Sequence, residues 1–97
     1  MIEYLYDAIR ATAGQTVPVY ATFANDDGTF VSEGVVFMLH EPDGKHIVTV
    51  EGSYNAETGQ WTFNVPGEAT AGRKGRHFYC FQHEGANMCF LRPYYLM

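Results

Sequence analysis

Apolar and polar residues alternate along much of this 97-residue chain. The alternation is clearest over residues 16–23, where Val17, Val19 and Phe23 share one face with Ala21. A period of two is typical of a half-buried β-strand, because successive side chains of a strand point to opposite sides. Pro18 lies within this run. Since proline has no backbone N–H, we expect an edge strand or a β-bulge here.

Four short polar sequences of the kind that form tight turns separate such runs. They are Asp26-Asp27-Gly28, Pro42-Asp43-Gly44, Glu57-Thr58-Gly59 and Glu84-Gly85-Ala86-Asn87. The intervening runs predict strands over residues 2–10, 16–23, 35–40, 46–50, 61–65, 76–83 and 88–96. Residues 67–75 lack apolar periodicity, and their length suits a crossover between sheets. About seven antiparallel strands with short turns and one crossover predict an all-β, Greek-key β-sandwich.

Length and composition indicate one domain over residues 1–97, with residues 1–12 as an N-terminal strand or a docking arm. Apolar residues make up 46% of the chain and aromatic residues 15%, which is ample for one core. The run over residues 35–40 is apolar on both faces. It suits a central strand covered on both sides, or one whose outer face meets another protein.

The net charge of −5 argues against a general nucleic-acid-binding protein. Three basic residues, Arg73, Lys74 and Arg76, lie together in one loop. They predict a contact with an anion or with an acidic partner, and the alternative is a solvated loop. No apolar run is long enough to span a membrane, and no secretion signal follows Met1. We therefore expect no membrane partner and no secretion by a signal peptide.

The sequence offers one candidate set of metal ligands, namely His77, Cys80, His83 and Cys89. Zinc uses such ligands. On one strand, however, residues 77 and 83 face one side and residue 80 the other, so we expect no metal and no cofactor. A hairpin centred on residues 85–86 places Cys80 opposite Leu91, too far from Cys89 for a disulfide. A register shifted by one residue would place the two cysteines opposite each other.

Catalytic patterns are not evident. Asp26, Asp27, Asp43 and Glu57 lie in turn sequences, where such residues are favoured for backbone reasons. Neither serine of the chain lies in a nucleophile elbow. We expect a protein that is not an enzyme.

Aromatic residues exceed what one small core needs, and they include the consecutive pairs 78–79 and 94–95. In each pair one ring must face away from the core. Since exposed aromatic residues mark protein interfaces, we predict a protein-contact surface. Its candidate residues are Tyr4, Tyr6, Tyr20, Met38, Tyr79, Tyr94 and Tyr95.

Several sequences together resemble a known family. They are Ala13-Gly14-Gln15-Thr16, Asp26-Asp27-Gly28-Thr29, Pro42-Asp43-Gly44-Lys45, the run 54–61 from Tyr54 to Trp61, and Gly75-Arg76-His77-Phe78-Tyr79. Over residues 13–97 the chain resembles the immunoglobulin-like domains of tailed-phage virion proteins, such as the N-terminal domain of baseplate upper proteins. The resemblance implies an immunoglobulin-like sandwich without catalytic residues.

The resemblance further implies a structural protein of a tailed-phage or prophage particle, in head decoration, tail or baseplate. Its partners would be other virion proteins of the capsid or tail, or copies of itself. Its location would be the virion, after synthesis in the cytoplasm of a bacterial host. The alternative is a carbohydrate-binding module or adhesion domain that stacks exposed aromatic rings on sugars. Trp61 is a weak candidate for that role, because it alternates with Phe63 and Val65 as a core residue does.

Overall fold

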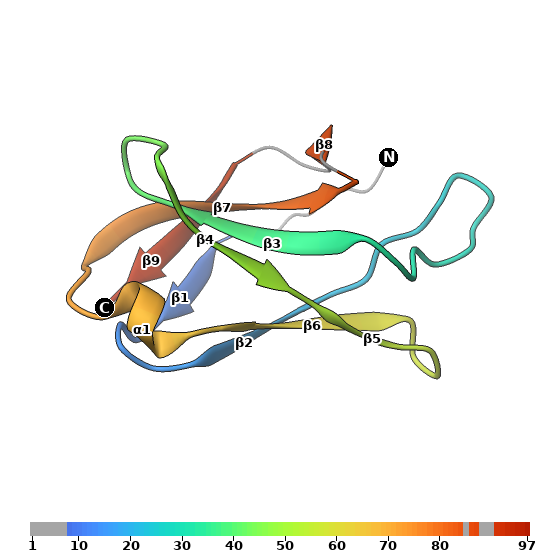
Figure 1. Ribbon diagram of the computed structural model, residues 1–97, viewed down its shortest axis with the longest axis horizontal. Coiled ribbons are helices and arrows are strands. Elements are labelled where there is room, and N and C mark those ends of the chain that lie inside the picture. Colours follow the sequence, from blue (N-terminus) through green and yellow to red (C-terminus); the bar gives the residue numbers. More distant parts are fainter. Residues whose placement is uncertain (1–7, 85, 88–90) are drawn as a thin grey trace.

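Two β-sheets pack face to face in the computed structural model, which describes residues 8–84, 86–87 and 91–97 (Figure 1). The larger sheet contains β1 (Ile9–Ala11), β9 (Arg92–Leu96), β7 (Gly75–His83), β3 (Val35–His40) and β4 (His46–Glu51), in that spatial order, with β8 (Ala86–Asn87) beside β7. The smaller sheet contains β2 (Val17–Ala21), β6 (Gln60–Val65) and β5 (Ser53–Asn55). The predicted all-β sandwich is confirmed.

Neighbouring strands are antiparallel except β1, which runs parallel to β9 at the rim of the larger sheet. The predicted crossover is confirmed, because residues 66–74 carry the chain from β6 in one sheet to β7 in the other. They contain the helix α1 (Gly67–Thr70), and no described helix is long and apolar enough to cross a bilayer. The chain also changes sheet between β1 and β2, between β2 and β3, and at Gly52 between β4 and β5.

The core lies between the sheets and follows the alternation of the sequence. Val19 and Phe23 are buried from the smaller sheet's side, while Tyr20 between them is exposed. Val35, Phe37 and Leu39 of β3 are buried, whereas the residues between them are only partly covered. Pro18 lies in β2, an edge strand, as predicted.

Turn carboxylates serve the backbone as the sequence predicts. The side chain of Asp27 accepts hydrogen bonds from the Thr29 hydroxyl at 2.6 Å and from the Thr29 amide at 3.0 Å. These two bonds stabilise the ionised carboxylate and lower the pKa of Asp27. Asp43 accepts a bond from the Lys45 amide in the same way. Both carboxylates are therefore turn-forming groups.

The last hairpin differs from the prediction near its turn. Tyr79 lies opposite Arg92, the predicted register, but Gln82 pairs with Asn87 and not with Cys89. The turn is shifted towards the N-terminus, and Glu84 has a φ of 51°, a left-handed conformation that tight hairpin turns use. Cys89 and the predicted strand residues 2–7 lie outside the described residues.

Candidate protein-contact surface

The larger sheet has an outer face, turned away from the smaller sheet, that is unusually nonpolar. Strand alternation places Val36, Met38, Phe78 and Pro93 on it, between residues that point into the core. All four are half-buried. The polar members of this face lie mostly towards its margins, and they are Arg10, His40, His46, Thr49, Glu51, Arg76, Gln82 and Tyr95.

Register joins these residues into a continuous stripe across β3, β7 and β9. Met38 lies opposite Cys80, His40 opposite Phe78, and Phe78 opposite Pro93. Directly opposed side chains on one face of a sheet are in contact range. Cys80 at the centre of the stripe is only 2% exposed, so its neighbours cover it almost completely. We call Val36, Met38, Phe78, Cys80 and Pro93 the nonpolar stripe.

Two arginines lie over aromatic rings beside the stripe. The guanidinium carbon of Arg76 lies 5.2 Å from the ring centre of Phe78, and that of Arg10 lies 5.6 Å from the ring centre of Tyr95. Both distances are within the range of cation–π interactions, worth about 0.5–1 kcal/mol at exposed sites. The nonpolar stripe is thus bordered by positive charge where β7 begins, at Arg76, and on β1, at Arg10.

Two histidines also border the stripe. Nε2 of His40 lies 3.7 Å from Sγ of Cys80, and the ring of His40 meets that of His46 edge to face at 6.0 Å. Burial, and secondarily the charge of His46, lower the pKa of His40. His40 is therefore neutral near pH 7. Within the described part of the chain, no group of three His, Cys, Asp or Glu side chains is placed to hold a metal ion.

The prediction of a surface position is wrong for Tyr79 and Tyr94, because both residues belong to the core. Tyr79 is 7% exposed and Tyr94 fully buried, and their rings pack at 6.2 Å. One ring of each consecutive pair does face outward, as predicted, but in the first pair it is Phe78. The prediction missed Phe78 since it did not assign a side to each ring. The sequence of residues 77–82 indicates which ring faces the core, because the residues on the side of Tyr79 and Phe81 are the more aromatic set.

The remaining predicted interface residues do not form one surface. Met38 and Tyr95 lie on the outer face of the larger sheet, and both are half-buried. Tyr20 is 59% exposed and lies on the outer face of the smaller sheet, on the opposite side of the sandwich. Tyr4 and Tyr6 lie outside the described residues. The larger sheet therefore holds most of the candidates that can be placed.

The three residues of the predicted basic cluster have different contacts in the structure. Arg73 forms an ion pair with Glu41 at 2.9 Å and also donates to the Ala69 carbonyl, so its charge is compensated within the domain. The contact with an anion or an acidic partner stays a prediction for Arg73, whose charge is already paired. Arg76 lies over Phe78, and Lys74 is exposed. A contact with an acidic partner stays a prediction for Lys74 and Arg76.

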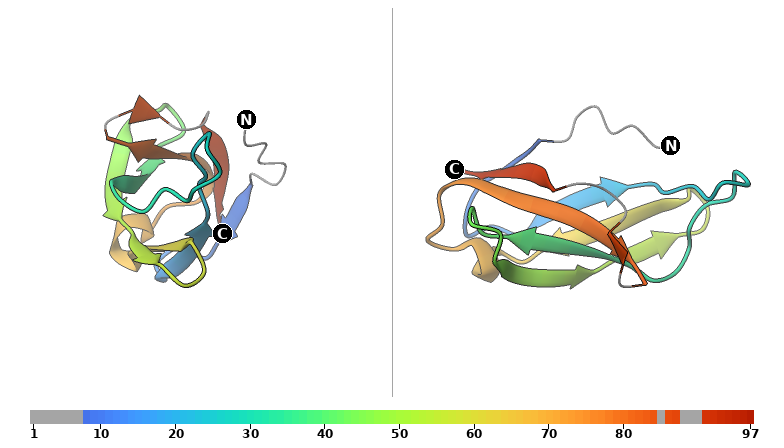
Figure 2. Two further views of the ribbon diagram at one scale, coloured as in Figure 1. Left: turned by 90° about the vertical axis from the view of Figure 1, so that its right-hand side faces the viewer. Right: turned by 90° about the horizontal axis from the view of Figure 1, so that it is seen from above.

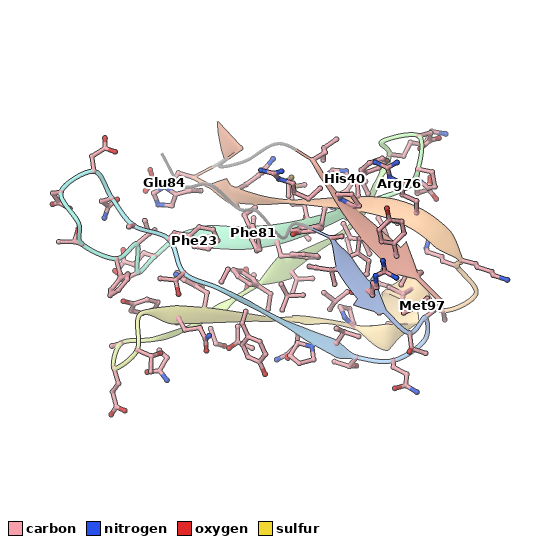
Figure 3. The ribbon with its side chains drawn as sticks, turned by 180° about the vertical axis from the view of Figure 1, so that it is seen from behind. Phe23, His40, Arg76, Phe81, Glu84 and Met97 are labelled. Carbon is pink, nitrogen blue, oxygen red and sulfur yellow. The ribbon has the colours of Figure 1, made fainter. Side chains whose placement is uncertain are left out.

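Charge is distributed unevenly along the molecule. Lys45, Arg73, Lys74 and Arg76 lie in or beside the turns at one end, where β7 begins, together with the acidic residues Glu41, Asp43 and Glu68. Asp26, Asp27, Glu33, Glu57 and Glu84 lie in or beside turns at the opposite end, where β7 ends. Figure 3 labels Arg76 and Glu84 near these two ends, with Phe23 and Phe81 packed at 5.0 Å between the sheets.

His77 and Trp61, which the sequence offered as a candidate metal ligand and a candidate sugar-stacking residue, lie in the core. His77 is 3% exposed on the inner side of β7, whereas Cys80 belongs to the outer face, so the predicted separation of these two residues is observed. Trp61 is 4% exposed, and its Nε1 donates a hydrogen bond of 2.7 Å to the carbonyl of Val31. Trp61 is therefore inaccessible to a sugar ring.

Comparison with known proteins bears on the fold alone. No protein-family model matches the chain, and no curated protein matches it. The chain is similar to the solved structure of the Lin-41 filamin domain, with a TM-score of 0.59 and 15% sequence identity, over 99% of this chain and 88% of that one. This similarity supports the predicted immunoglobulin-like fold. Domains of this fold are typically not enzymes, although a fold does not by itself define a function.

Proposed function

We propose that this domain is a non-enzymatic structural protein of a tailed-phage or prophage particle, located in the virion as a head decoration, tail or baseplate accessory subunit. It binds other virion proteins through the outer face of the larger sheet. The observation that carries the proposal is the nonpolar stripe, whose side chains other than Cys80 are half-buried and lie on a face that no other described strand or helix covers. The resemblance over residues 13–97 is the basis for proposing a phage particle as the location. The nonpolar stripe is the basis for proposing the contact surface.

The chemistry of this face suits a protein partner. Specific interfaces have a nonpolar centre with aromatic residues and arginine enriched, and a polar rim. Here Met38 and Phe78 lie near the centre, while Arg76, Arg10 and Glu51 lie at the margins. A partner that covered the stripe would gain about 25 cal/mol for each Å² of nonpolar surface buried.

The smaller sheet offers a weaker contact surface. Its outer face carries Pro18, Tyr20, Thr62 and Asn64, so its only large nonpolar group among the described residues is a single tyrosine. A lone exposed side chain is ordinary for a soluble protein and needs no partner to explain it. The two faces therefore provide a matched test within one molecule.

The test is the presence of the chain in particles. Tailed particles induced from the source strain are purified on a density gradient, and the amount of this chain per particle is measured by mass spectrometry. A deletion strain is complemented with the wild type, with Phe78→Ser/Tyr95→Ser, and with Tyr20→Ser as the control. We expect the wild type and the control at equal, fixed amounts per particle.

The variant of the larger sheet should be reduced at least about tenfold, the equivalent of about 1.4 kcal/mol of binding free energy. Circular dichroism and a thermal melt on each purified chain separate lost binding from lost folding. Absence of the wild-type chain from the particles would refute the proposed location. Equal incorporation of all three chains would refute the proposed face.

A further inference from the structure

Among the described residues, five strands have an unpaired edge, and four of them are poorly suited to pair with another strand. β8 has two residues, β1 and β5 have three residues each, and β2 contains Pro18. Short edges and proline are devices by which proteins prevent unwanted strand pairing. β4 has six residues, contains neither proline nor lysine, and is the last strand of the larger sheet. Figure 2 shows it as the rim of that sheet in the right-hand view.

The residues of β4 favour strand pairing strongly. Ile47, Val48, Thr49 and Val50 are four consecutive β-branched residues, the class most enriched in strands. The register with β3 is irregular only at the start of β4, where His46 lies opposite His40, and is regular from Val48 to Glu51. β4 therefore presents an edge that is regular over residues 48–51, free of proline and lysine, and next to the nonpolar stripe.

We propose that β4 pairs with β4 of a second copy of this chain, antiparallel and around a two-fold axis at Thr49. In an antiparallel ladder, directly opposed residues must lie on the same face of the sheet. A register centred on Thr49 meets this condition over residues 48–50, because it places Val48, which packs against the core, opposite Val50 of the second copy, and Thr49 opposite Thr49. Ile47, which also packs against the core, would lie opposite the exposed Glu51 at each end of this ladder. A register shifted by one residue would oppose inward and outward side chains.

The charge of Glu51 and the burial of Val50 favour the register centred on Thr49 over the registers centred on the residues next to it. Glu51 is the one acidic residue of β4, and in this register the two Glu51 positions lie four residues apart along the ladder, about 13 Å. That separation exceeds the Debye length of about 8 Å at physiological salt, so their repulsion is largely screened. Centring the pair on Val50 would bring them to about 7 Å, and centring it on Val48 would place the buried Val50 opposite the exposed His46.

The product is one continuous sheet across two copies. The nonpolar stripes of the two copies would lie on the same side of it, separated by the paired β4 strands, because Thr49 lies beside Met38 on the outer face. A two-fold pair of this kind is isologous, the commonest symmetry of protein oligomers. The contact uses a different surface from the β7 and β9 residues altered in the particle test, so either proposal can fail while the other stands.

The experiment measures solution mass by light scattering over a concentration series, for the wild type, Thr49→Lys, Thr49→Glu and an equimolar mixture of the two variants. Thr49 is exposed, so neither substitution should unfold the domain. We expect a wild-type dimer, and self-association weakened at least about tenfold in each variant by like charges opposed at the axis. The mixture should regain the dimer mass, since a lysine then faces a glutamate.

Asn64→Lys is the control, because it adds the same charge at an exposed strand position of the smaller sheet's central strand. It should leave the dimer intact. A wild type that stays monomeric across the series would overturn the proposal. A wild-type dimer that is unaffected by either Thr49 variant would place the dimer contact elsewhere and overturn it equally.

Discussion

The inner faces of the two sheets are alike in character, whereas their outer faces differ. Inward, both present large nonpolar side chains, such as Phe37 from the larger sheet and Phe63 from the smaller one, with ring centres 6.3 Å apart. Outward, the smaller sheet presents Thr62 and Asn64, whereas the larger sheet presents Met38 and Phe78 at comparable central positions. Folding explains the inner faces. It does not by itself require the outward Met38 and Phe78, and this difference is the basis of the proposed contact with another protein.

The largest expected difference between an inner and an outer position concerns consecutive residues of β9. Tyr94→Ser removes a fully buried ring that packs against Phe37 and Tyr79, and should lower the free energy of unfolding by about 3–5 kcal/mol. Tyr95→Ser removes a half-buried outer ring and should cost less than about 1 kcal/mol. Urea denaturation of both variants checks this. Equal losses would show that Tyr95 also belongs to the core.

The next effect concerns Gly52, where the chain passes from the larger sheet to the smaller. A Cβ atom at this position would lie 2.5 Å from Cε1 of Phe63 and 2.7 Å from Cε3 of Trp61. Since both rings are buried and stacked on each other, Gly52→Ala should cost about 1–3 kcal/mol through overpacking. Ser53→Ala, at the neighbouring exposed residue, is the control. A thermal melt of Gly52→Ala that matched the control would mean that the two rings can move apart.

How far the sequence could predict this fold depends on the length of each alternating run. Val19 and Phe23 were placed inside and Tyr20 outside because one unbroken run fixed their relative sides. The path of β4 and β5 was harder to foresee, since Gly52 lets one stretch of chain change sheets without a turn signal. The register near Glu84 was mispredicted because a left-handed residue other than glycine moved the turn.

The contact surface was predictable only in part, and for a physical reason. Alternation shows that one of Tyr94 and Tyr95 faces outward, but not which one, because both are apolar enough to be buried. The partners of a strand decide the side, and these come from distant residues: His77 lies opposite Tyr94, and Arg76 opposite Tyr95. Likewise, no sequence spacing indicates that Arg73 is neutralised by Glu41, 32 residues away.

A smaller effect sharpens the contrast between the two hydroxyl groups of β9. The hydroxyl of Tyr94 is buried without a hydrogen-bond partner among the described residues, and burial raises the pKa of Tyr94 to about 12. In the unfolded chain this tyrosine loses its proton near pH 10, so the unfolded state binds fewer protons than the folded state between pH 10 and 12. Stability is therefore full below pH 10 and decreases as the pH rises towards 12.

Tyr94→Phe should remove this dependence. Relative to that variant, the wild type should lose about 1–3 kcal/mol between pH 10 and 12, as measured by denaturant unfolding at fixed pH values. At pH 7 the variant should be as stable as the wild type or up to about 1 kcal/mol more stable, since an unsatisfied buried hydroxyl is removed. Tyr95→Phe is the matched control, and an identical alkaline profile for both variants would contradict the assignment to Tyr94.

The smallest effect on stability comes from exchanging the character of the two outer faces. Met38→Thr places a polar group in the nonpolar stripe, and Thr62→Met places a nonpolar one at the centre of the smaller sheet. Both positions are half-buried, so each change should alter the free energy of unfolding by no more than about 1 kcal/mol. Retention on a hydrophobic-interaction column should decrease for the first variant and increase for the second. If Met38→Thr were retained as strongly as the wild type, the outer face of the larger sheet would not be the main nonpolar surface of this protein. The contrast between the faces would then reflect packing within the sheet rather than a site for a partner.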